Sequence, residues 1–225
     1  YLLKKKRKLR YICAQPASLY YAWQVEVLLN NFKELDINLN DVDIVCSYDG
    51  DVSDEWVKLA TNYAARFFFY KDTRLSKKYI SSIRPNILKQ HFKAHPYLKD
   101  DAIFYHDCDI MFTKPPKDWI TKEMINDDNW YGSDVKWYIS YDYIKQKGQD
   151  ILEKMCDIIG ISVESVKDNN ENCIGAQYLL KDISSYFWER VENESETLFS
   201  EITALNVEKK KQNSEEKKNQ GLLEE

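Results

Sequence analysis

The sequence predicts an α/β domain with a single core, a mostly parallel central sheet and a helical extension at the C-terminal end. Two observations favour this fold. Short apolar runs alternate with longer segments of helical periodicity, which is typical of strands joined by crossover helices. Only six glycines and five prolines occur among 225 residues, which argues against a collagenous or disordered chain. We expect the domain to cover residues 1–190, followed by a helix and polar tail over residues 191–225.

In the first part of the chain, three short apolar segments predict strands, and two segments of helical spacing lie between them. The strands cover residues 9–15, 42–50 and 66–70. The helices cover residues 19–32 and 53–65, the second with Ser53 as a suitable N-cap. The second strand ends in an Asp-Gly turn.

The second part predicts a helix over residues 83–95 that leads into a strand over residues 102–107. A loop with two consecutive prolines follows over residues 113–119, because proline lacks the N–H that a helix or central strand requires. The remaining segments predict two strands and two helices. The strands cover residues 129–135 and 174–181; the helices cover residues 138–159 and 182–220, the last wholly polar after Val207.

Charge and cysteine content limit the classes of protein to consider. The net charge of −5 speaks against a nucleic-acid binder with a broad basic surface. The basic cluster of residues 4–10 is expected to be a solvated lead-in to the first strand, and the alternative is a weak contact with an anionic membrane surface. Five scattered cysteines predict free thiols in a reducing compartment. We therefore expect a cytoplasmic protein, peripheral to a membrane if the basic cluster binds one.

Polar side chains follow three of the predicted strands. Gln15 follows the first, Asp49 and Asp51 the second, and Asp107 and Asp109 the strand at residues 102–107. Ligands of parallel sheets bind beyond the carboxyl ends of the strands. We therefore expect these side chains to meet at the rim of one crevice.

The two aspartates of the stretch "YHDCDIMF" flank a single cysteine, so both can turn to one side where the strand breaks into a turn. Hard divalent cations prefer such oxygen ligands and keep waters or substrate phosphates as the rest of their shell. Zinc is disfavoured because no histidine or cysteine cluster surrounds the pair. Mn²⁺ or Mg²⁺ at Asp107 and Asp109 would neutralise the charge that builds on a departing diphosphate.

The segment "AIFYHDCDIMFTKPP" resembles the signature of GT-A-fold glycosyltransferases: an apolar strand, a D-x-D motif and a proline loop. It is most similar to the pattern of the glycogenin and lipopolysaccharide-galactosyltransferase group, and the order of elements agrees over residues 9–190. The resemblance implies a single Rossmann-like GT-A domain. It further implies transfer of a sugar, with retention, from a UDP-linked donor to a glycan, protein or lipid acceptor.

Position by position, the resemblance implies that Asp107 approaches the ribose and the metal, and that Asp109 ligates the metal directly. The residues expected against the nucleotide are Gln15, Pro16 and Ala17, with Asp49 near the base or ribose. Those expected to face the donor from the helix before the D-x-D strand are Arg84 and Lys89. Those expected around the donor sugar are Asp134, Gly175, Ala176 and Gln177, the small residues permitting close approach.

Asp134 and Gln177 are the candidate catalytic residues. An inverting enzyme needs a general base for the acceptor hydroxyl, and Asp134 is the best candidate. A retaining enzyme would use the phosphate of the donor instead, with Gln177 or Asp134 steadying the sugar. Structural alternatives stay open: Asp49 as a turn residue, Arg84 in a surface ion pair, and Asp134 and Gln177 as framework groups.

The chain departs from the group in one respect. The third metal ligand, often a histidine near the C-terminus, has no counterpart, since the three histidines are His91, His95 and His106. Either water and phosphate complete the shell or the ligand lies beyond Glu225. His106 itself is expected to be a hydrogen-bonded core histidine, with a substrate contact as the alternative.

Two other functions fit the same residues. A sugar-phosphate nucleotidyltransferase is disfavoured because "CAQPAS" has no glycine with which the backbone could wrap a triphosphate. A non-catalytic nucleotide- or glycan-binding module would bind UDP with a metal but would not turn over any UDP-sugar.

Overall fold

The computed structural model describes residues 6–221, with side chains as far as Gln212. It contains a six-stranded sheet in the order β3-β2-β1-β4-β6-β5. The strands are β1 Leu9–Pro16, β2 Val42–Tyr48, β3 Arg66–Lys71, β4 Ala102–Tyr105, β5 Tyr131–Asp134 and β6 Ile174–Lys181. The first four run parallel, whereas β6 is antiparallel to both β4 and β5. The expected α/β class with a mostly parallel sheet is confirmed.

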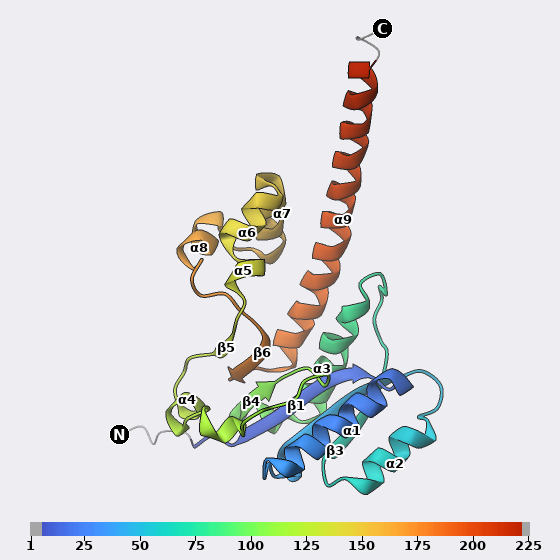
Figure 1. The fold of residues 1–225 in the computed structure, drawn as a ribbon, viewed down its shortest axis with the longest axis vertical. Helices are drawn as coiled ribbons and strands as arrows, with labels where there is room; N and C mark the ends of the chain where they lie inside the picture. The colour runs from blue at the N-terminus through green and yellow to red at the C-terminus, as the bar shows by residue number, and fades with distance from the viewer. Residues whose placement is uncertain (1–5, 222–225) are drawn as a thin grey trace. The chain divides into compact units, whose positions relative to one another are not determined.

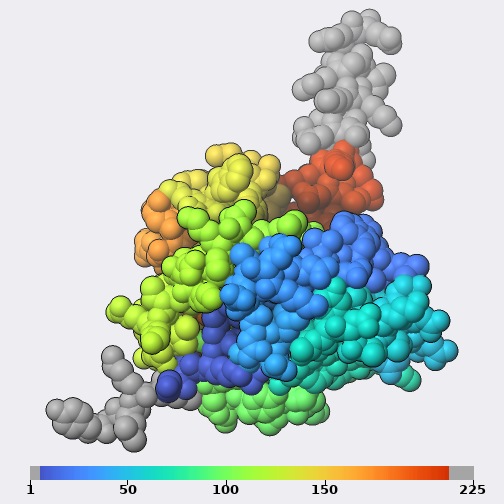
Figure 2. All heavy atoms as spheres, turned by 60° about the horizontal axis from the view of Figure 1, so that its bottom comes forward, coloured from blue at the N-terminus to red at the C-terminus, as the bar shows by residue number. Residues whose placement is uncertain are grey.

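Helices from the first half of the chain cover both faces of the parallel strands (Figure 1). Those of the first half are α1 Leu19–Glu34, α2 Asp54–Asn62 and α3 Ile83–Ala94, and those of the second half are α4 Lys122–Asn126, α5 Lys136–Ile139, α6 Tyr141–Lys147, α7 Gln149–Ile159, α8 Val163–Asp168 and α9 Ser185–Gly221. The helix expected over residues 138–159 is broken at Ser140, which caps α6, and at Gly148, which separates α6 from α7. In Figure 2, α1 in blue and α2 in cyan lie side by side on one face.

The core consists of two apolar layers, one on each face of the sheet. Between the sheet and α1 and α2 lie side chains such as Phe32, Trp56 and Phe104, all nearly or fully buried. Between the sheet, α3 and the start of α9 lie residues such as Ile87 and Trp188. Successive strand residues alternate between the two layers, as the pleat requires. Burial on both faces explains why the strands are continuous apolar runs.

The order of the strands reverses between β1 and β4. From β1 the chain proceeds outward through α1, β2, α2 and β3, and it then returns through α3 to place β4 on the other side of β1. As a consequence, α1 and α3 lie on opposite faces and diverge from the point where β1 and β4 are neighbours. Such a reversal is where open α/β sheets bind ligands, beyond the carboxyl ends of the strands.

The contacts divide the chain into two compact units. The first, residues 1–75, 81–135 and 174–192, contains the whole sheet. The second, residues 76–80, 136–173 and 193–225, contains α5 to α8 and most of α9. The helix α9 passes from the first unit to the second between Glu192 and Asn193. The sequence pattern did not indicate that residues 136–173 belong with this later part.

The second unit has internal contacts of its own. Lys154 pairs with Glu201 at 3.0 Å, and Lys209 pairs with Asp150 at 2.6 Å, so two ion pairs join α7 to α9. The ring of Tyr79 stacks on that of Phe199. None of the helices within residues 6–221 is long and apolar enough to cross a membrane.

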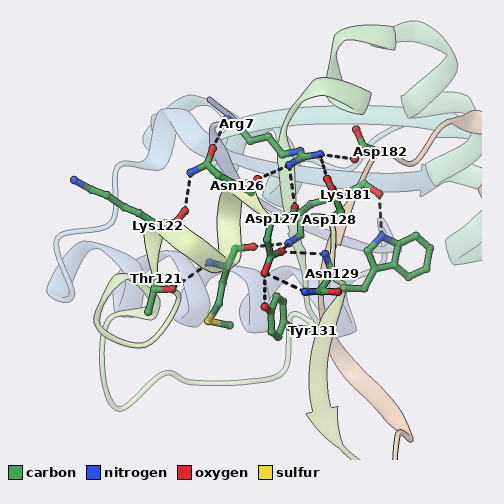
Figure 3. A network of polar contacts seen from close by, with 12 residues as sticks. Arg7, Thr121, Lys122, Asn126, Asp127, Asp128, Asn129, Tyr131, Lys181 and Asp182 are labelled. Carbon is green, nitrogen blue, oxygen red and sulfur yellow. Dashed lines mark hydrogen bonds and ion pairs between the residues drawn. The ribbon is translucent and has the colours of Figure 1, made fainter. Parts of the chain in front are cut away.

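A buried network fastens the amino end of β1 to the segment after α4 (Figure 3). The Arg7 guanidinium donates to the backbone carbonyl oxygens of Asn126 and Asp127 and pairs with Asp182. The Lys181 ammonium, 1% exposed, donates to the Met124 carbonyl oxygen and pairs with Asp127. Lys181 holds the pKa of Asp127 well below its usual range. These contacts tie the antiparallel edge of the sheet to its parallel part.

The network changes the interpretation of the basic cluster. Lys4 and Lys5 lie outside the described residues. Arg7 is buried in the network, and Arg10 is buried against Asp101. Arg7 and Arg10 therefore form internal ion pairs and are not available to a membrane surface. The expectation that the whole cluster is a solvated lead-in is wrong for these two residues.

A second buried charge cluster lies at the amino ends of β2 and β3. The Asp43 carboxylate is fully buried and accepts two hydrogen bonds from Arg66, each 2.6 Å long. It also lies 3.1 Å from Nε2 of His91, whose Nδ1 is 3.0 Å from the Tyr70 hydroxyl. The cluster joins two strands to α3 at the edge of the sheet farthest from the strand carboxyl ends.

We expect Asp43→Asn to lower the free energy of unfolding by about 3 kcal/mol, because the change leaves buried donors without their anion. The value is at the low end of the usual range since Arg66 is partly in water. Urea titration monitored by circular dichroism measures it. Asp51→Asn, at an exposed position, is the matched control and should change stability by less than about 0.5 kcal/mol. Equal stability of the two variants would contradict a structural role of the cluster.

Candidate functional site

The candidate site lies at the carboxyl ends of β1 and β4, where the strand order reverses. The strand β4 ends at Tyr105, and the backbone leaves the sheet before Asp107. The N-terminal turns of α1 and α3 lie at the same edge, because both helices follow a strand and run antiparallel to it. The edge is thus lined by the segment after β1, the D-x-D segment and the first turn of α3.

Arg84 and Asp107 form the central contact of this edge. Arg84 lies in the first turn of α3, and its Nη1 is 3.0 Å from Oδ1 of Asp107. Both side chains are about one-third exposed, so the pair is open to solvent on one side. Tyr21 of α1 and Tyr105 of β4 act electrostatically on the same guanidinium. The guanidinium therefore lies among groups from both helices that flank the strand reversal.

The titration of Asp107 reflects three opposing effects. Burial raises the pKa of this carboxyl, Arg84 lowers it, and the negative charge of Asp109 raises it, and the net result lies above the ordinary value. Asp109 itself is exposed. Asp107 and Asp109 carry two negative charges when ionised, and the Arg84 guanidinium neutralises only one of them.

The residues expected against the nucleotide are placed differently from one another. Gln15 is fully buried, and its amide nitrogen donates to the Val45 carbonyl oxygen and to Sγ of Cys46. Its side chain therefore belongs to the core layer under α1 rather than to a surface. Pro16 and Ala17, at the end of β1, are half-buried. Within the described chain Gln15 Oε1 has no hydrogen-bond partner.

Asp49 and Lys89 lie away from the central ion pair. Asp49 is exposed in the turn after β2, next to Gly50, which adopts a φ of 76°. Lys89 lies on α3 and pairs with Glu192 of α9 at 2.6 Å. Lys89 therefore helps to hold α9 against α3, and the expectation that it faces the donor is not reflected in its contacts.

Small residues of β5 and β6 serve the close packing of the two strands. A Cβ on Gly175 would lie 2.8 Å from Cγ2 of Val135, and a Cβ on Gly132 would lie 2.7 Å from Cβ of Ile174. Glycine at both positions lets β5 and β6 approach. The register between these strands shifts at Gly132 and Ser133, which marks a bulge.

Ala176 adopts a φ of 59° and is exposed. This left-handed conformation costs a non-glycine residue roughly 1–2 kcal/mol. Backbone strain of this kind concentrates at functional sites. Here it reorients the strand just before Gln177.

Gln177, one of the two candidate catalytic residues, is hydrogen-bonded to Ser133 and not to the D-x-D pair. The hydroxyl of Ser133 donates to Oε1 of Gln177 at 2.6 Å, and both side chains line a pocket with Trp119. Asp134 is exposed at the end of β5, in register with Ile174. Gln177 is therefore grouped with aromatic residues on the α1 face, whereas Asp107 pairs with Arg84 of α3, which covers the other face.

His106 is a core residue, as expected. It is fully buried, and its ring contacts those of Phe32, Phe104 and Phe112. Its Nδ1 lies 2.8 Å from the carbonyl oxygen of Asp107. Burial lowers the pKa of His106 to about 4, so the ring is neutral at physiological pH. Through this contact His106 supports the backbone of the D-x-D segment from the side of the core.

A hard cation fits the D-x-D pair only with help from a ligand. Asp107 and Asp109 supply carboxylate oxygens, and one oxygen of Asp107 is already engaged by Arg84. Among residues 6–221, no group of three or more histidine, cysteine, aspartate or glutamate side chains is arranged to hold a metal ion. The donor set therefore suits Mn²⁺ or Mg²⁺ whose remaining ligands are water and phosphate oxygens, which is how Mg²⁺ is usually held.

Sequence reasoning missed three residues of this region. Trp119 and Ser133 line the pocket around Gln177, and Asn31 of α1 fixes one of its walls. The proline loop "TKPPKDW" signalled a turn but not that its tryptophan would fold back onto β4. The pairing of Ser133 with Gln177 depends on the antiparallel register of β5 and β6, which strand patterns alone do not specify.

Comparison of the chain with protein-family models, with curated proteins and with solved structures gave no match. The case for a function accordingly rests on the geometry described above. All five cysteines are free thiols, as the sequence indicated.

We expect two substitutions to shift the pKa of Asp107 in opposite directions. Arg84→Gln removes the neighbouring cation and raises this pKa, whereas Asp109→Asn removes the neighbouring anion and lowers it. Carboxyl-carbon NMR titration of the protein with labelled aspartate measures both shifts. Asp118→Asn, an exposed change in the loop that follows, should leave the pKa of Asp107 unchanged. Shifts of the same sign in Arg84→Gln and Asp109→Asn would contradict the arrangement.

We expect Ala176→Gly to raise the free energy of unfolding by about 0.5–1 kcal/mol, because relief of the left-handed strain exceeds the added chain entropy of glycine. The matched control is Ala60→Gly within α2, where the same change should lower stability by about 1 kcal/mol. Thermal and urea unfolding of both variants measure the two signs. A destabilising Ala176→Gly would show that the backbone here is not strained.

Proposed function

We propose that this protein is a metal-dependent glycosyltransferase of GT-A type that transfers a sugar from a UDP-linked donor to an acceptor hydroxyl. The observation that supports this most is the position of the D-x-D pair. Asp107 and Asp109 follow the carboxyl end of β4, next to β1, where the strand order reverses, and Arg84 reaches Asp107 from the first turn of α3. A diphosphate needs both cationic and cation-binding groups at one edge, and the chain supplies both there.

The chemistry follows from the charges. In the transfer, the bond between the anomeric carbon and the diphosphate oxygen breaks, and the diphosphate leaves with the electron pair. A new bond forms to the acceptor oxygen, whose proton passes to a base. Arg84 would bind the departing diphosphate, and Mn²⁺ or Mg²⁺ at the aspartates would supply further charge neutralisation when bound.

The proton acceptor distinguishes two stereochemical outcomes. For retention, which the family resemblance favours, a phosphate oxygen of the donor would take the proton. For inversion, Asp134 is the candidate base, and it is exposed at the end of β5. A non-catalytic nucleotide-binding module with the same two aspartates is the competing function, since it would need no proton acceptor.

The decisive experiment is calorimetric titration of UDP into the protein with and without Mn²⁺. We expect UDP binding to require the metal and to weaken at least about tenfold in Asp109→Ala, a loss of about 1.4 kcal/mol. Asp118→Ala is the control for the loss of one negative charge in the same loop and should bind like the wild type.

The outcomes separate the candidate functions. Metal-dependent UDP binding together with slow hydrolysis of a UDP-sugar supports the transferase, and UDP binding without turnover of any UDP-sugar supports the binding module. If UDP, GDP and CDP all fail to bind with Mn²⁺ present, the proposal is overturned.

A further inference from the structure

A pocket of about 320 Å³ lies on the α1 face of the sheet, between β4, β6 and the segment after the D-x-D motif. Most of its lining side chains are apolar, including Phe104, Met111 and Trp119, and the polar ones are Ser133 and Gln177. The volume is at the lower end of the range of roughly 300–1,000 Å³ that small-molecule sites occupy. It therefore suits a ligand of about one ring.

The walls of the pocket are held in place by α1 and β4. The backbone N–H of Phe112 donates to Oδ1 of Asn31 at 2.8 Å, and Nδ2 of Asn31 donates to the Phe112 carbonyl oxygen at 3.1 Å. The indole of Trp119 meets the ring of Phe104 edge-on, with centroids 5.5 Å apart. In Figure 2 the yellow-green segment after the D-x-D motif lies beside α1.

The backbone beneath the polar pair is irregular on both strands. Ala176, next to Gln177, has a φ of 59°, and the register of β5 and β6 shifts at Ser133. A bulge and a left-handed residue at one place turn side chains out of the regular alternation of a strand. Here they bring the Ser133 hydroxyl within 2.6 Å of the Gln177 amide oxygen.

The hydrogen bond between these two side chains determines what they can recognise. Because one lone pair of Gln177 Oε1 accepts from Ser133, the groups left entirely for a ligand are the amide hydrogens of Gln177 and the lone pairs of Ser133 Oγ. A hydroxyl group accepts from the first and donates to the second. A nucleobase edge such as that of adenine requires the amide oxygen and nitrogen of Gln177 together, and it would have to share the oxygen with Ser133.

The charge of the lining excludes the phosphate part of a nucleotide. No charged side chain lines this pocket within the described residues. The Arg84–Asp107 pair lies toward the other face, because Phe104 and Tyr105 of β4 point into opposite core layers and α3 covers the layer of Tyr105. We propose that the pocket is a binding site for one neutral sugar ring, whose C–H face lies on Trp119 and whose hydroxyls meet Gln177 and Ser133.

This ring could belong to the donor or to the acceptor, and the proposal covers both. Its chemistry is independent of the metal and the nucleotide, so failure of UDP to bind would leave it standing as a sugar-binding site. Conversely, UDP can bind at Asp109 even if the pocket binds no sugar.

The test uses saturation-transfer NMR with a panel of neutral methyl glycosides: those of glucose, galactose, mannose and N-acetylglucosamine. We expect at least one of them to receive saturation from the wild-type protein. The signal should fall at least about fivefold in Trp119→Ala and in Gln177→Leu. It should persist in Asp109→Ala and in the matched control Trp137→Ala, which removes a tryptophan that is 79% exposed on α5. Trp119 is itself 45% exposed, so its truncation should leave the fold intact, and circular dichroism verifies this.

The outcomes assign the ring or reject the site. If a UDP-sugar with Mn²⁺ displaces the glycoside whereas UDP with Mn²⁺ does not, the ring is that of the donor. If the glycoside stays bound beside the UDP-sugar, the ring is that of the acceptor. The proposal is overturned if no glycoside of the panel contacts the wild type, if contact persists in Trp119→Ala, or if uridine and not a glycoside occupies the pocket in a Trp119-dependent manner.

Discussion

The reversal of strand order between β1 and β4 is the constraint on which the rest of this structure depends. Because crossover connections in a parallel sheet keep one hand, a chain that changes direction along the sheet must also change the face on which its helices lie. The helix α1 therefore covers one face and α3 the other, and their first turns diverge above the neighbouring strand ends. Every polar group of the Arg84–Asp107 edge is brought there by this reversal and not by proximity in sequence.

The two ends of the sheet carry their charges in different ways. At the amino ends, Asp43, Arg7 and Lys181 are buried and engaged in internal contacts. At the carboxyl ends, Arg84 and Asp107 are about one-third exposed, and Asp109 is open to water. Buried ion pairs hold the layers together, whereas the partly exposed pair can exchange a partner for a ligand. This contrast is the physical reason to look for function at one end and for stability at the other.

Much of the fold could be predicted from the sequence, since apolar runs such as residues 42–48 and the helical spacing of α1 are local signals. The position of Asp107 at a strand end was equally local. What could not be predicted depends on contacts between distant segments: the burial of Gln15 beside Cys46, the pairing of Lys89 with Glu192, and the meeting of Ser133 with Gln177. Each of these contacts depends on a residue that is distant in the sequence, and a single sequence does not show which distant residue becomes the neighbour.

The junction of β5 and β6 has a consequence for how this fold can vary. Asp134 and Ile174 are paired residues of adjacent strands, yet all of α5 to α8 lies between them in the chain. The segment therefore leaves the sheet and returns to it at two paired positions on adjacent strands, one strand spacing apart. For such an inserted segment, the entropy of joining its ends grows only with the logarithm of its length. The length of the segment can therefore change at a small cost in free energy. The strand register, and with it the place of Gln177, stays the same.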